Sequence, residues 1–281
     1  MRIVINEHSP IYFELIELLT FTLRELGHTV TITENQMASG PVNLLVGATA
    51  FLTQQQYTAI RSFRGHFIVF QNEVLADDAG FVREPPGYVE FLAGASQIWD
   101  YSPTNLPFLN LHGCRRVHYI PIGYAPSLER IVHAPERDID VLFYGSINPR
   151  RERLLLAVTQ SQLKLKALFG VYGAARDREI ARAKVVLNVH QFDAPHLEEL
   201  RLAYLLNNRC FIVSEKADRN PYGRGVVFRE YDDLVDCCVA YCAAGMDSER
   251  NAVANEGYAM LKGISTAVGV RVALERLGSE F

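Results

Sequence analysis

Short apolar runs alternate with segments of helical periodicity through residues 1–120. One helix is expected to end at Gly27, and another is expected from an N-cap at Thr53 to Ile60. Ser102 and Pro103 form an N-cap and N1 pair for a third helix. The near-continuous apolar runs predict buried parallel strands at residues 3–5, 30–33, 44–46, 67–70, 97–99 and 117–120. Six strands alternating with helices are enough for one doubly wound sheet.

The alternation stops at residues 121–137, where Pro126 and Pro135 indicate a linker. It restarts with predicted strands at residues 141–144, 165–169, 185–189, 210–213 and 226–228, followed by helices at 232–242, 249–262 and 268–277. The pattern therefore predicts an α/β protein of two Rossmann-like domains facing across a cleft. The expected domains are residues 1–125 and 136–281, with a last helix able to pack back on the first domain.

Composition agrees with a globular protein of ordinary core size. Hydrophobic residues make up 49% of the 281 residues and charged residues 21%. The formal net charge of -4 gives no electrostatic reason to expect nucleic acid or an anionic membrane as a partner. The sequence shows neither a signal-peptide pattern nor the apolar run of about 18 residues that a membrane span needs, so we expect a cytoplasmic protein. The five cysteines lack a paired C-x-x-C spacing and are expected to be buried thiols.

Polar side chains cluster in the stretch 184–215, where a buried strand is followed by a polar loop, a helix and another buried strand. Asn188 and His190 lie at the end of the first strand, where open α/β sheets bind ligands. Pro195 suits the first turn of the helix, and Glu198 and Arg201 share one of its sides. An ordinary βαβ unit with a surface ion pair between Glu198 and Arg201 is the alternative interpretation.

The motif FYGSINPRRERLL follows the first strand of the second half. Gly145 permits close backbone approach, Ser146 offers a hydroxyl group, and Asn148 can cap the next helix. Arg150 and its neighbour Arg151 in the first helical turn favour a bound anion such as phosphate, although pairing with Glu152 or Asp138 explains them equally well. Arg176 opens the helix after the next strand. Neither the G-x-G-x-x-G fingerprint nor the P-loop motif occurs.

The first half offers two candidate bases. His8 directly follows the first strand, in NEHSP, and Glu73 follows another strand, in FQNE. Either side chain is suited to removing a proton from a hydroxyl nucleophile. Asp100 occupies a similar position after a strand and is expected at least to cap.

The chain resembles bacterial GT-B glycosyltransferases, in particular the short glycosyltransferase-like proteins related to the spore-maturation CgeB group. The resemblance is carried by WDYSPTNLPFL, PIGY, FYGSINPRR, LNVH, HLEELRLAYLLNN and FIVSE, in this order. It implies that the C-terminal half holds a nucleotide-activated sugar and the N-terminal half presents the acceptor. Glu198 matches the glutamate that commonly holds the ribose or the sugar of the donor in that family.

Two departures from the family pattern affect the expected chemistry. Gln191 and His190 stand seven and eight residues before Glu198 and neither is acidic, so the E-x7-E pattern of retaining members is absent. The glycine-rich loop after the first strand is replaced by Asn6 to Pro10. These departures favour an inverting displacement assisted by His8 or Glu73 over retaining chemistry.

The resulting hypothesis is a glycosyltransferase that moves a sugar from a nucleoside diphosphate sugar to a hydroxyl acceptor without a metal ion or a cofactor. A sugar-nucleotide epimerase and a non-catalytic cytoplasmic nucleotide-sugar-binding protein are the alternatives. The expected catalytic residues are His8 and Glu73. The expected donor-binding residues are Gly145, Ser146, Arg150, Arg176, Asn188, His190, Glu198 and Arg201.

Overall fold

The computed structural model describes residues 2–7, 9–34, 36–48, 52–75, 87–191, 193 and 195–278. The chain divides into two compact units. Unit 1 comprises Met1–Ser127 and Ser265–Phe281, and unit 2 comprises Leu128–Ile264. No helix in the described part of the chain combines the length and the hydropathy needed to cross a membrane.

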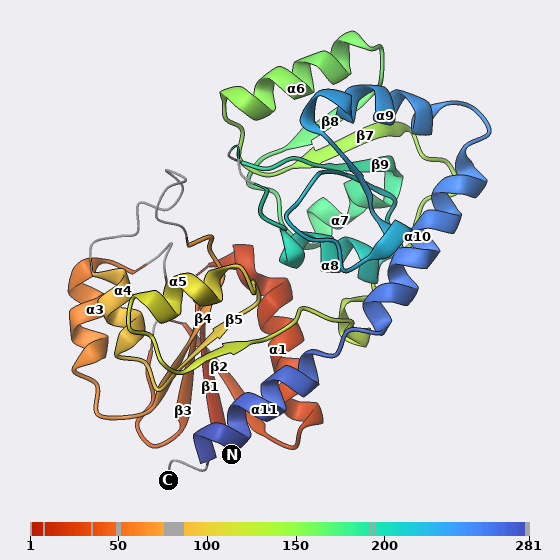
Figure 1. The fold of residues 1–281 in the computed structure, drawn as a ribbon. Coiled ribbons are helices and arrows are strands. Elements are labelled where there is room, and N and C mark those ends of the chain that lie inside the picture. Colours follow the sequence, from red (N-terminus) through yellow and green to blue (C-terminus); the bar gives the residue numbers. More distant parts are fainter. Residues whose placement is uncertain are drawn as a thin grey trace. The chain divides into compact units, whose positions relative to one another are not determined.

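Unit 1 is built on a sheet of six parallel strands (Figure 1), as the apolar runs predict. Its order is β2-β1-β3-β4-β5-β6. The strands are β1 (Arg2–Glu7), β2 (Thr29–Glu34), β3 (Val42–Val46), β4 (Phe67–Gln71), β5 (Gln97–Asp100) and β6 (Val117–Tyr119). Strands β3, β4 and β5 are buried along their whole length, and their polar residues, Asn43, Gln71, Gln97 and Asp100, lie at a strand end or next to one.

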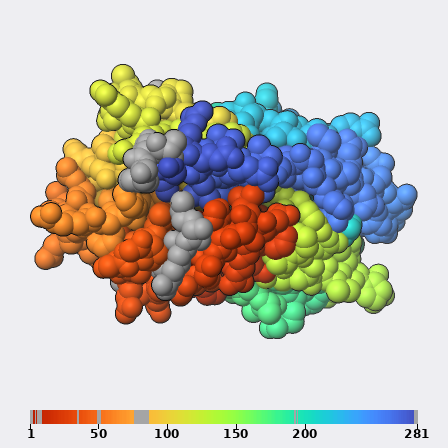
Figure 2. All heavy atoms as spheres, turned by 90° about the horizontal axis from the view of Figure 1, so that it is seen from below, coloured from red at the N-terminus to blue at the C-terminus, as the bar shows by residue number. Residues whose placement is uncertain are grey.

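Helices cover both faces of this sheet. On one face, the aromatic rings of Tyr57, Tyr88 and Phe91 pack against Phe67. On the other face, α1 packs beside the C-terminal helix α11, which is drawn in deep blue in Figure 2. The elements are the 3-10 helix η1 (Pro10–Tyr12), α1 (Phe13–Glu25), α3 (Gln54–Arg61), α4 (Tyr88–Ala93), α5 (Asn105–Leu111) and α11 (Thr266–Gly278).

Helix α11 is fastened to unit 1 although it comes last in the chain. Gly123 N donates to Thr266 Oγ1 at 2.9 Å, and Gln97 Nε2 donates to the carbonyl oxygen of Ala273 at 2.7 Å. A Cβ atom on Gly269 would lie 2.8 Å from Pro121 Cδ, so only glycine permits this approach.

The capping predictions for unit 1 were partly right. Thr53 forms the expected capping box at the start of α3. Helix α5, in contrast, starts at Asn105 instead of directly after Ser102. The cause is Asp100, whose Oδ1 accepts hydrogen bonds from Ser102 N at 2.7 Å and from Asn105 Nδ2 at 3.2 Å and so holds residues 102–104 in a turn.

Unit 2 contains a five-stranded parallel sheet of order β11-β10-β9-β7-β8. This is the order of the first five strands of unit 1, with the first strand between the second and the third. In both sheets the order therefore reverses beside the first strand, where open α/β sheets bind ligands at the carboxyl ends of the strands. The strands are β7 (Ile139–Tyr144), β8 (Leu165–Leu168), β9 (Ala183–Asn188), β10 (Ile212–Glu215) and β11 (Val227–Arg229).

The helices of unit 2 bury an apolar core against this sheet. Leu154 and Val158 of α6 and Leu234 and Cys238 of α9 pack on Phe143 and its neighbours. Described cysteines are all free thiols, and all but Cys242 are buried, as expected. The elements are α6 (Pro149–Gln160), α7 (Gly173–Arg182), α8 (Glu199–Asn207), α9 (Leu234–Cys242), α10 (Asp247–Lys262) and the 3-10 helices η3 (Gly223–Gly225) and η4 (Tyr231–Asp233). The 3-10 helix η2 (Pro126–Leu128) spans the boundary between the two units in the sequence.

The expected linker is anchored from Leu128 onward by Asn208, the C-cap of α8. Asn208 Oδ1 accepts hydrogen bonds from Arg130 N and Ile131 N, both at 2.8 Å. Asn208 Nδ2 donates to the carbonyl oxygens of Leu128 and Tyr204, both at 2.9 Å. One buried amide thus satisfies four backbone groups and joins the segment to α8.

Replacing Asn208 with Ala should lower the free energy of unfolding by about 2–4 kcal/mol, because it leaves several buried backbone groups without partners. Urea denaturation monitored by circular dichroism measures this change. Gln160→Ala, at the exposed end of α6, is the control and should change stability by less than about 0.5 kcal/mol. Equal stability of the two variants would contradict the anchoring role of Asn208.

Candidate functional site

In the loop after β7, the backbone of Gly145 lies close to the guanidinium groups of Arg151 and Arg201. Gly145 has a φ of +141°, and a Cβ atom there would lie 3.0 Å from Arg201 Nη2, so glycine lets this guanidinium approach the backbone. Asn148 caps α6 as predicted, because its Oδ1 accepts from Arg151 N at 2.9 Å and Pro149 occupies the first turn. Ser146 Oγ donates to Gln191 Oε1 at 3.0 Å, which links this loop to the one after β9.

Arg151 joins the carboxyl ends of β7 and β9. It is only 3% exposed, and its guanidinium donates to the carbonyl oxygen of Val189 at 3.0 and 2.6 Å and to that of Ser146 at 2.9 Å. Burial, together with the positive charge of Arg201, lowers the pKa of Arg151 to about 10. The group therefore remains a buried cation at neutral pH, hydrogen-bonded to neutral oxygens.

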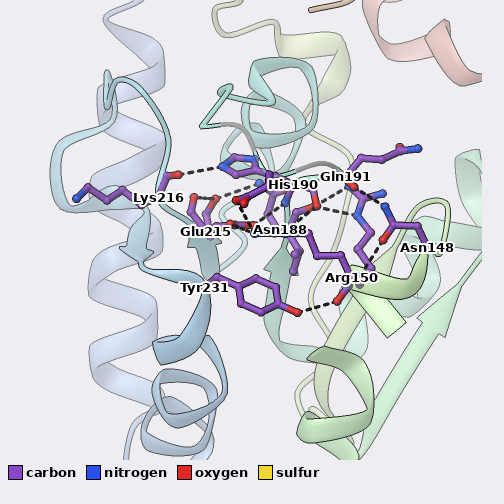
Figure 3. Close-up of polar contacts among 12 residues, drawn as sticks. Asn148, Arg150, Asn188, His190, Gln191, Glu215, Lys216 and Tyr231 are labelled. Atoms are coloured by element: carbon purple, nitrogen blue, oxygen red, sulfur yellow. Dashed lines mark hydrogen bonds and ion pairs between the residues drawn. The ribbon is translucent and has the colours of Figure 1, made fainter. Parts of the chain in front are cut away.

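Arg150 lies in an ion pair with Glu215, at the end of β10 (Figure 3). Its Nη1 donates to Glu215 Oε2 at 2.8 Å, and its guanidinium lies 4.1 Å from the ring centroid of Tyr231. Tyr231 Oη in turn donates to the carbonyl oxygen of Arg150 at 2.7 Å. Glu215 also accepts from His190 N at 3.0 Å, so one carboxylate connects β9, β10 and α6.

His190 and Glu198 form the second charged pair of this edge. His190 Nδ1 lies 2.9 Å from Glu198 Oε2, and Nε2 lies 2.9 Å from the carbonyl oxygen of Lys216. Both partners are acceptors, so both ring nitrogens carry hydrogen and the ring is the imidazolium. Burial opposes both charges, but the pair raises the pKa of His190 and lowers that of Glu198 to about 2. Asn188 Nδ2 adds a hydrogen bond to Glu198 Oε2 at 2.8 Å.

Arg201 of α8 and Arg176 of α7 both lie close to Tyr144, the last residue of β7. Arg201 Nη1 donates to Asn188 Oδ1 at 2.9 Å, and its guanidinium lies 4.9 Å from the ring centroid of Tyr144. Arg176 lies 5.4 Å from that ring and pairs with Asp177 at 2.9 Å. The structure thus brings all eight predicted donor residues to the carboxyl edge of β7, β9 and β10 or to the helices that support it.

Three interpretations based on sequence spacing were wrong. Helix α8 begins at Glu199 and not at Pro195, because Glu198 is turned toward Asn188 and His190. Glu198 therefore hydrogen-bonds to His190, while Arg201 hydrogen-bonds to Asn188, in place of the suggested ion pair between them. Arg150 pairs with Glu215 and not with Glu152 or Asp138, which lies beside Arg182 instead.

Positive charge is in excess at this edge of unit 2. Arg150, Arg151, Arg201 and protonated His190 supply four cations, against the three carboxylates of Glu198, Glu215 and the exposed Asp193, which leaves a formal +1. Arg176 is balanced by Asp177. Cations that gather at the N-terminus of a helix, as Arg150 and Arg151 do at α6, are unfavourable unless an anion neutralises them. The site is therefore suited to an anionic ligand.

The predicted bases belong to unit 1. His8 lies outside the described residues. Glu73 follows β4 and is half-buried, and its Oε1 accepts from Tyr12 Oη at 3.1 Å and from Asn72 Nδ2 at 3.0 Å. Burial raises the pKa of Glu73, an effect that the hydrogen bond from Tyr12 partly offsets.

Several residues at the carboxyl edges of the two sheets were not predicted as site residues. Glu215 was overlooked although it ends a buried strand in FIVSE, where a carboxylate is as informative as the polar residues after β9. Tyr12 was given no role in the site, although it lies in the short 3-10 helix that follows the first strand. The described residues contain no group of three or more His, Cys, Asp or Glu placed to hold a metal ion.

Comparison with known structures identifies the fold. HepE (Alr3699) of Anabaena, solved with UDP and glucose, has a TM-score of 0.66 at 14% identity and aligns over 99% of this chain and 100% of its own. E. coli trehalose-6-phosphate synthase bound with UDP-2-fluoro glucose has a TM-score of 0.65 at 10% identity, over 99% of both chains. The chain has the GT-B fold. An α1,3-fucosyltransferase of this fold aligns with a TM-score of 0.51 at 8% identity, over 99% of this chain and 89% of its own.

Sequence comparison finds proteins that are themselves uncharacterised. Protein L138 of Acanthamoeba polyphaga mimivirus is 33% identical over 129 residues, which is 42% of this GT-B chain and 14% of L138. Protein L137 of the same virus is 28% identical over 151 residues, which is 50% of this chain and 20% of L137. The chain thus spans only a small part of the length of these relatives. No protein-family profile matches it.

Replacing Glu198 with Gln should lower the free energy of unfolding by about 1.5–3 kcal/mol, because it removes a charged hydrogen bond to His190. The stabilisation by Glu198 is present above its ordinary pKa of 4.5 and is lost as the pH falls toward about 2. The stabilisation by His190 is present below its ordinary pKa of 6.5 and is lost as the pH rises through its raised value. The difference from the wild type should therefore be largest between pH 4.5 and 6.5.

Urea denaturation at a series of pH values measures this profile. Glu230→Gln removes an exposed ion pair with Lys216 and is the control, with an expected change below about 1 kcal/mol. A difference for Glu198→Gln that does not vary with pH would show that the charge pair is not its cause.

Proposed function

We propose that this protein is a glycosyltransferase that moves a sugar from a nucleoside diphosphate sugar to a hydroxyl acceptor. The observation that carries the proposal is the excess of cations around the buried Arg151, at the strand-order reversal of unit 2 in a GT-B fold. A diphosphate is an anion of suitable size for several guanidinium groups. The UDP bound in the HepE structure makes a uridine nucleotide the first ligand to test.

The proposed donor site lies in unit 2. Arg151, Arg201 and the backbone around Gly145 and Ser146 hold the diphosphate, and the N-terminus of α6 adds its dipole. As the bond from the anomeric carbon to the diphosphate breaks, negative charge develops on the leaving oxygen. Cations already fixed by their neighbours stabilise that charge without reorganising.

Charged and amide side chains provide the contacts to the sugar. Glu198, held by His190 and Asn188, accepts hydrogen bonds from ribose or sugar hydroxyl groups. Asn188 and His190 line the donor sugar, and Arg176 supports the loop through Tyr144. In this scheme the guanidinium groups neutralise the leaving group in the role that a metal ion has in other transferases, which is why we propose a metal-independent reaction.

The acceptor domain in this proposal is unit 1. A base there removes the proton of the acceptor hydroxyl group, and direct attack on the anomeric carbon inverts its configuration. The absence of the E-x7-E pattern and the presence of Glu73 at the carboxyl edge of unit 1 support this inverting, base-assisted mechanism. Membership in the CgeB-related group and a cytoplasmic location stay predictions from the sequence.

Replacing Arg201 with Gln should weaken the binding of UDP by about 10- to 100-fold, because one charged hydrogen bond to phosphate contributes about 1.5–3 kcal/mol. Isothermal titration calorimetry with UDP measures the affinity. Arg153→Gln changes an exposed arginine of α6 by the same chemistry and should leave the affinity unchanged. Equal affinities for the two variants would remove Arg201 from the donor site.

Incubation with UDP-glucose alone separates the proposal from its two rivals. An isomerised sugar nucleotide would indicate an epimerase. Tight binding without turnover over a broad panel of hydroxyl acceptors would indicate a nucleotide-sugar-binding protein. Release of UDP that depends on the acceptor supports glycosyl transfer.

A further inference from the structure

Unit 1 has a strand-order reversal of its own, between β1 and β3, and one tyrosine ring fills it. Tyr12 ends η1, directly after β1, and is 8% exposed. Gly47 follows β3 with a φ of +77°, and a Cβ atom there would lie 2.3 Å from Tyr12 Cε2. The ring therefore packs closely on Gly47, at a position that leaves no room for a larger residue.

The hydroxyl group of Tyr12 belongs to a directed chain of hydrogen bonds. Asn72 Nδ2 donates to Tyr12 Oη at 2.8 Å, and Tyr12 Oη donates to Glu73 Oε1 at 3.1 Å. Asn72 is 6% exposed, and its Oδ1 is a buried acceptor without a hydrogen-bond partner. An unpaired buried acceptor beside a half-buried carboxylate is costly in a folded protein and indicates a ligand that donates hydrogen bonds.

Side chains from β4, α4 and α5 hold the backbone that carries Asn72 and Glu73. Gln71 Oε1 accepts from Glu73 N at 3.2 Å and from Tyr88 Oη at 3.0 Å. Asn105 Nδ2 donates to the carbonyl oxygen of Glu73 at 2.8 Å, and Asn105 Oδ1 accepts from Leu75 N at 2.9 Å. A segment fixed in this way holds its carboxylate in place before any ligand arrives.

We propose that Tyr12, Asn72 and Glu73 form the site for the acceptor hydroxyl group, in which Glu73 is the base and Tyr12 and Asn72 are positioning residues. This inference rests on the proposed function. The ligand class is a polyol or saccharide, because Glu73 and Asn72 Oδ1 are acceptors that match hydroxyl donors. Glu73 takes the proton, the acceptor oxygen forms the new bond to the anomeric carbon, and the electron pair of the broken bond leaves with the diphosphate.

The burial and the hydrogen bonds of Glu73 are consistent with its role as a base. Burial raises its pKa, the hydrogen bond from Tyr12 lowers it, and burial keeps Tyr12 itself protonated by raising the pKa of its phenol. Asp100, at the end of β5, is another carboxylate of this edge, and burial raises its pKa to about 7. It hydrogen-bonds to Ser102 and Asn105.

The test measures transfer from UDP-glucose to glucose, trehalose and glycerol by release of UDP, over a range of pH. Glu73→Gln should lower kcat by about 100- to 10,000-fold and leave the affinity for UDP unchanged. Tyr12→Phe should shift the acidic limb of the kcat/KM profile to higher pH, because it removes a hydrogen bond that lowers the pKa of Glu73. A purely structural role of Tyr12 would not move this limb.

Matched controls are Glu25→Gln and Tyr119→Phe, both at exposed positions of unit 1. Asp100→Asn should leave the acidic limb of the kcat/KM profile at its wild-type pH. This result would assign the limb to Glu73 and not to Asp100. Titration of the Glu carboxyl carbons by NMR gives the pKa of Glu73 directly and serves as the second measurement if Glu73→Gln fails to fold. In that measurement Tyr12→Phe should raise the pKa.

Two results would overturn the inference in different ways. Wild-type transfer that persists in folded Glu73→Gln, with UDP affinity intact, would remove the acceptor site and leave the proposed function standing. A wild-type protein that does not bind UDP or transfers glucose to no acceptor would contradict the proposed function and this site together.

Discussion

The buried guanidinium of Arg151 is the interaction on which the proposed donor site depends. It ties the loop after β7 to the end of β9 through the carbonyl oxygens of Ser146 and Val189. Because these partners are neutral, the positive charge is retained inside the protein, where burial makes it costly. Arg201, Arg150 and His190 add to that charge, and the three carboxylates of Glu198, Glu215 and Asp193 balance only part of it. The folded site therefore carries excess positive charge, which an anionic ligand would neutralise.

The two units share one strand order but differ in the sign of the charge that they gather. Unit 2 collects guanidinium groups around the reversal beside β7, whereas unit 1 places the carboxylates of Glu73 and Asp100 at its carboxyl edge. Cations suit a leaving diphosphate, and a carboxylate of raised pKa suits a hydroxyl nucleophile. The same topology thus supports two different chemical roles because the side chains at the strand ends differ.

Much of the fold was predictable because parallel strands buried on both faces have to be apolar. Runs such as residues 67–70 and 185–189 therefore stood out from their polar flanks. The placement of polar residues at strand ends also followed, which is why Asn188 and His190 were found. Pairings were not predictable from spacing, since Glu198 binds His190 across the loop and Arg150 binds Glu215, 65 residues away in the chain. Such partners meet only when the strands align.

By itself, the sequence determined the α/β class, the eleven strands, the cap at Asn148 and the arginine-rich loop after β7, because these depend on local periodicity and backbone propensity. The tertiary structure alone decided the strand order and the start of α8 at Glu199. It also brought Tyr12 onto Gly47 and beside Glu73. These features depend on contacts between residues far apart in the chain, whose free energy no local pattern records.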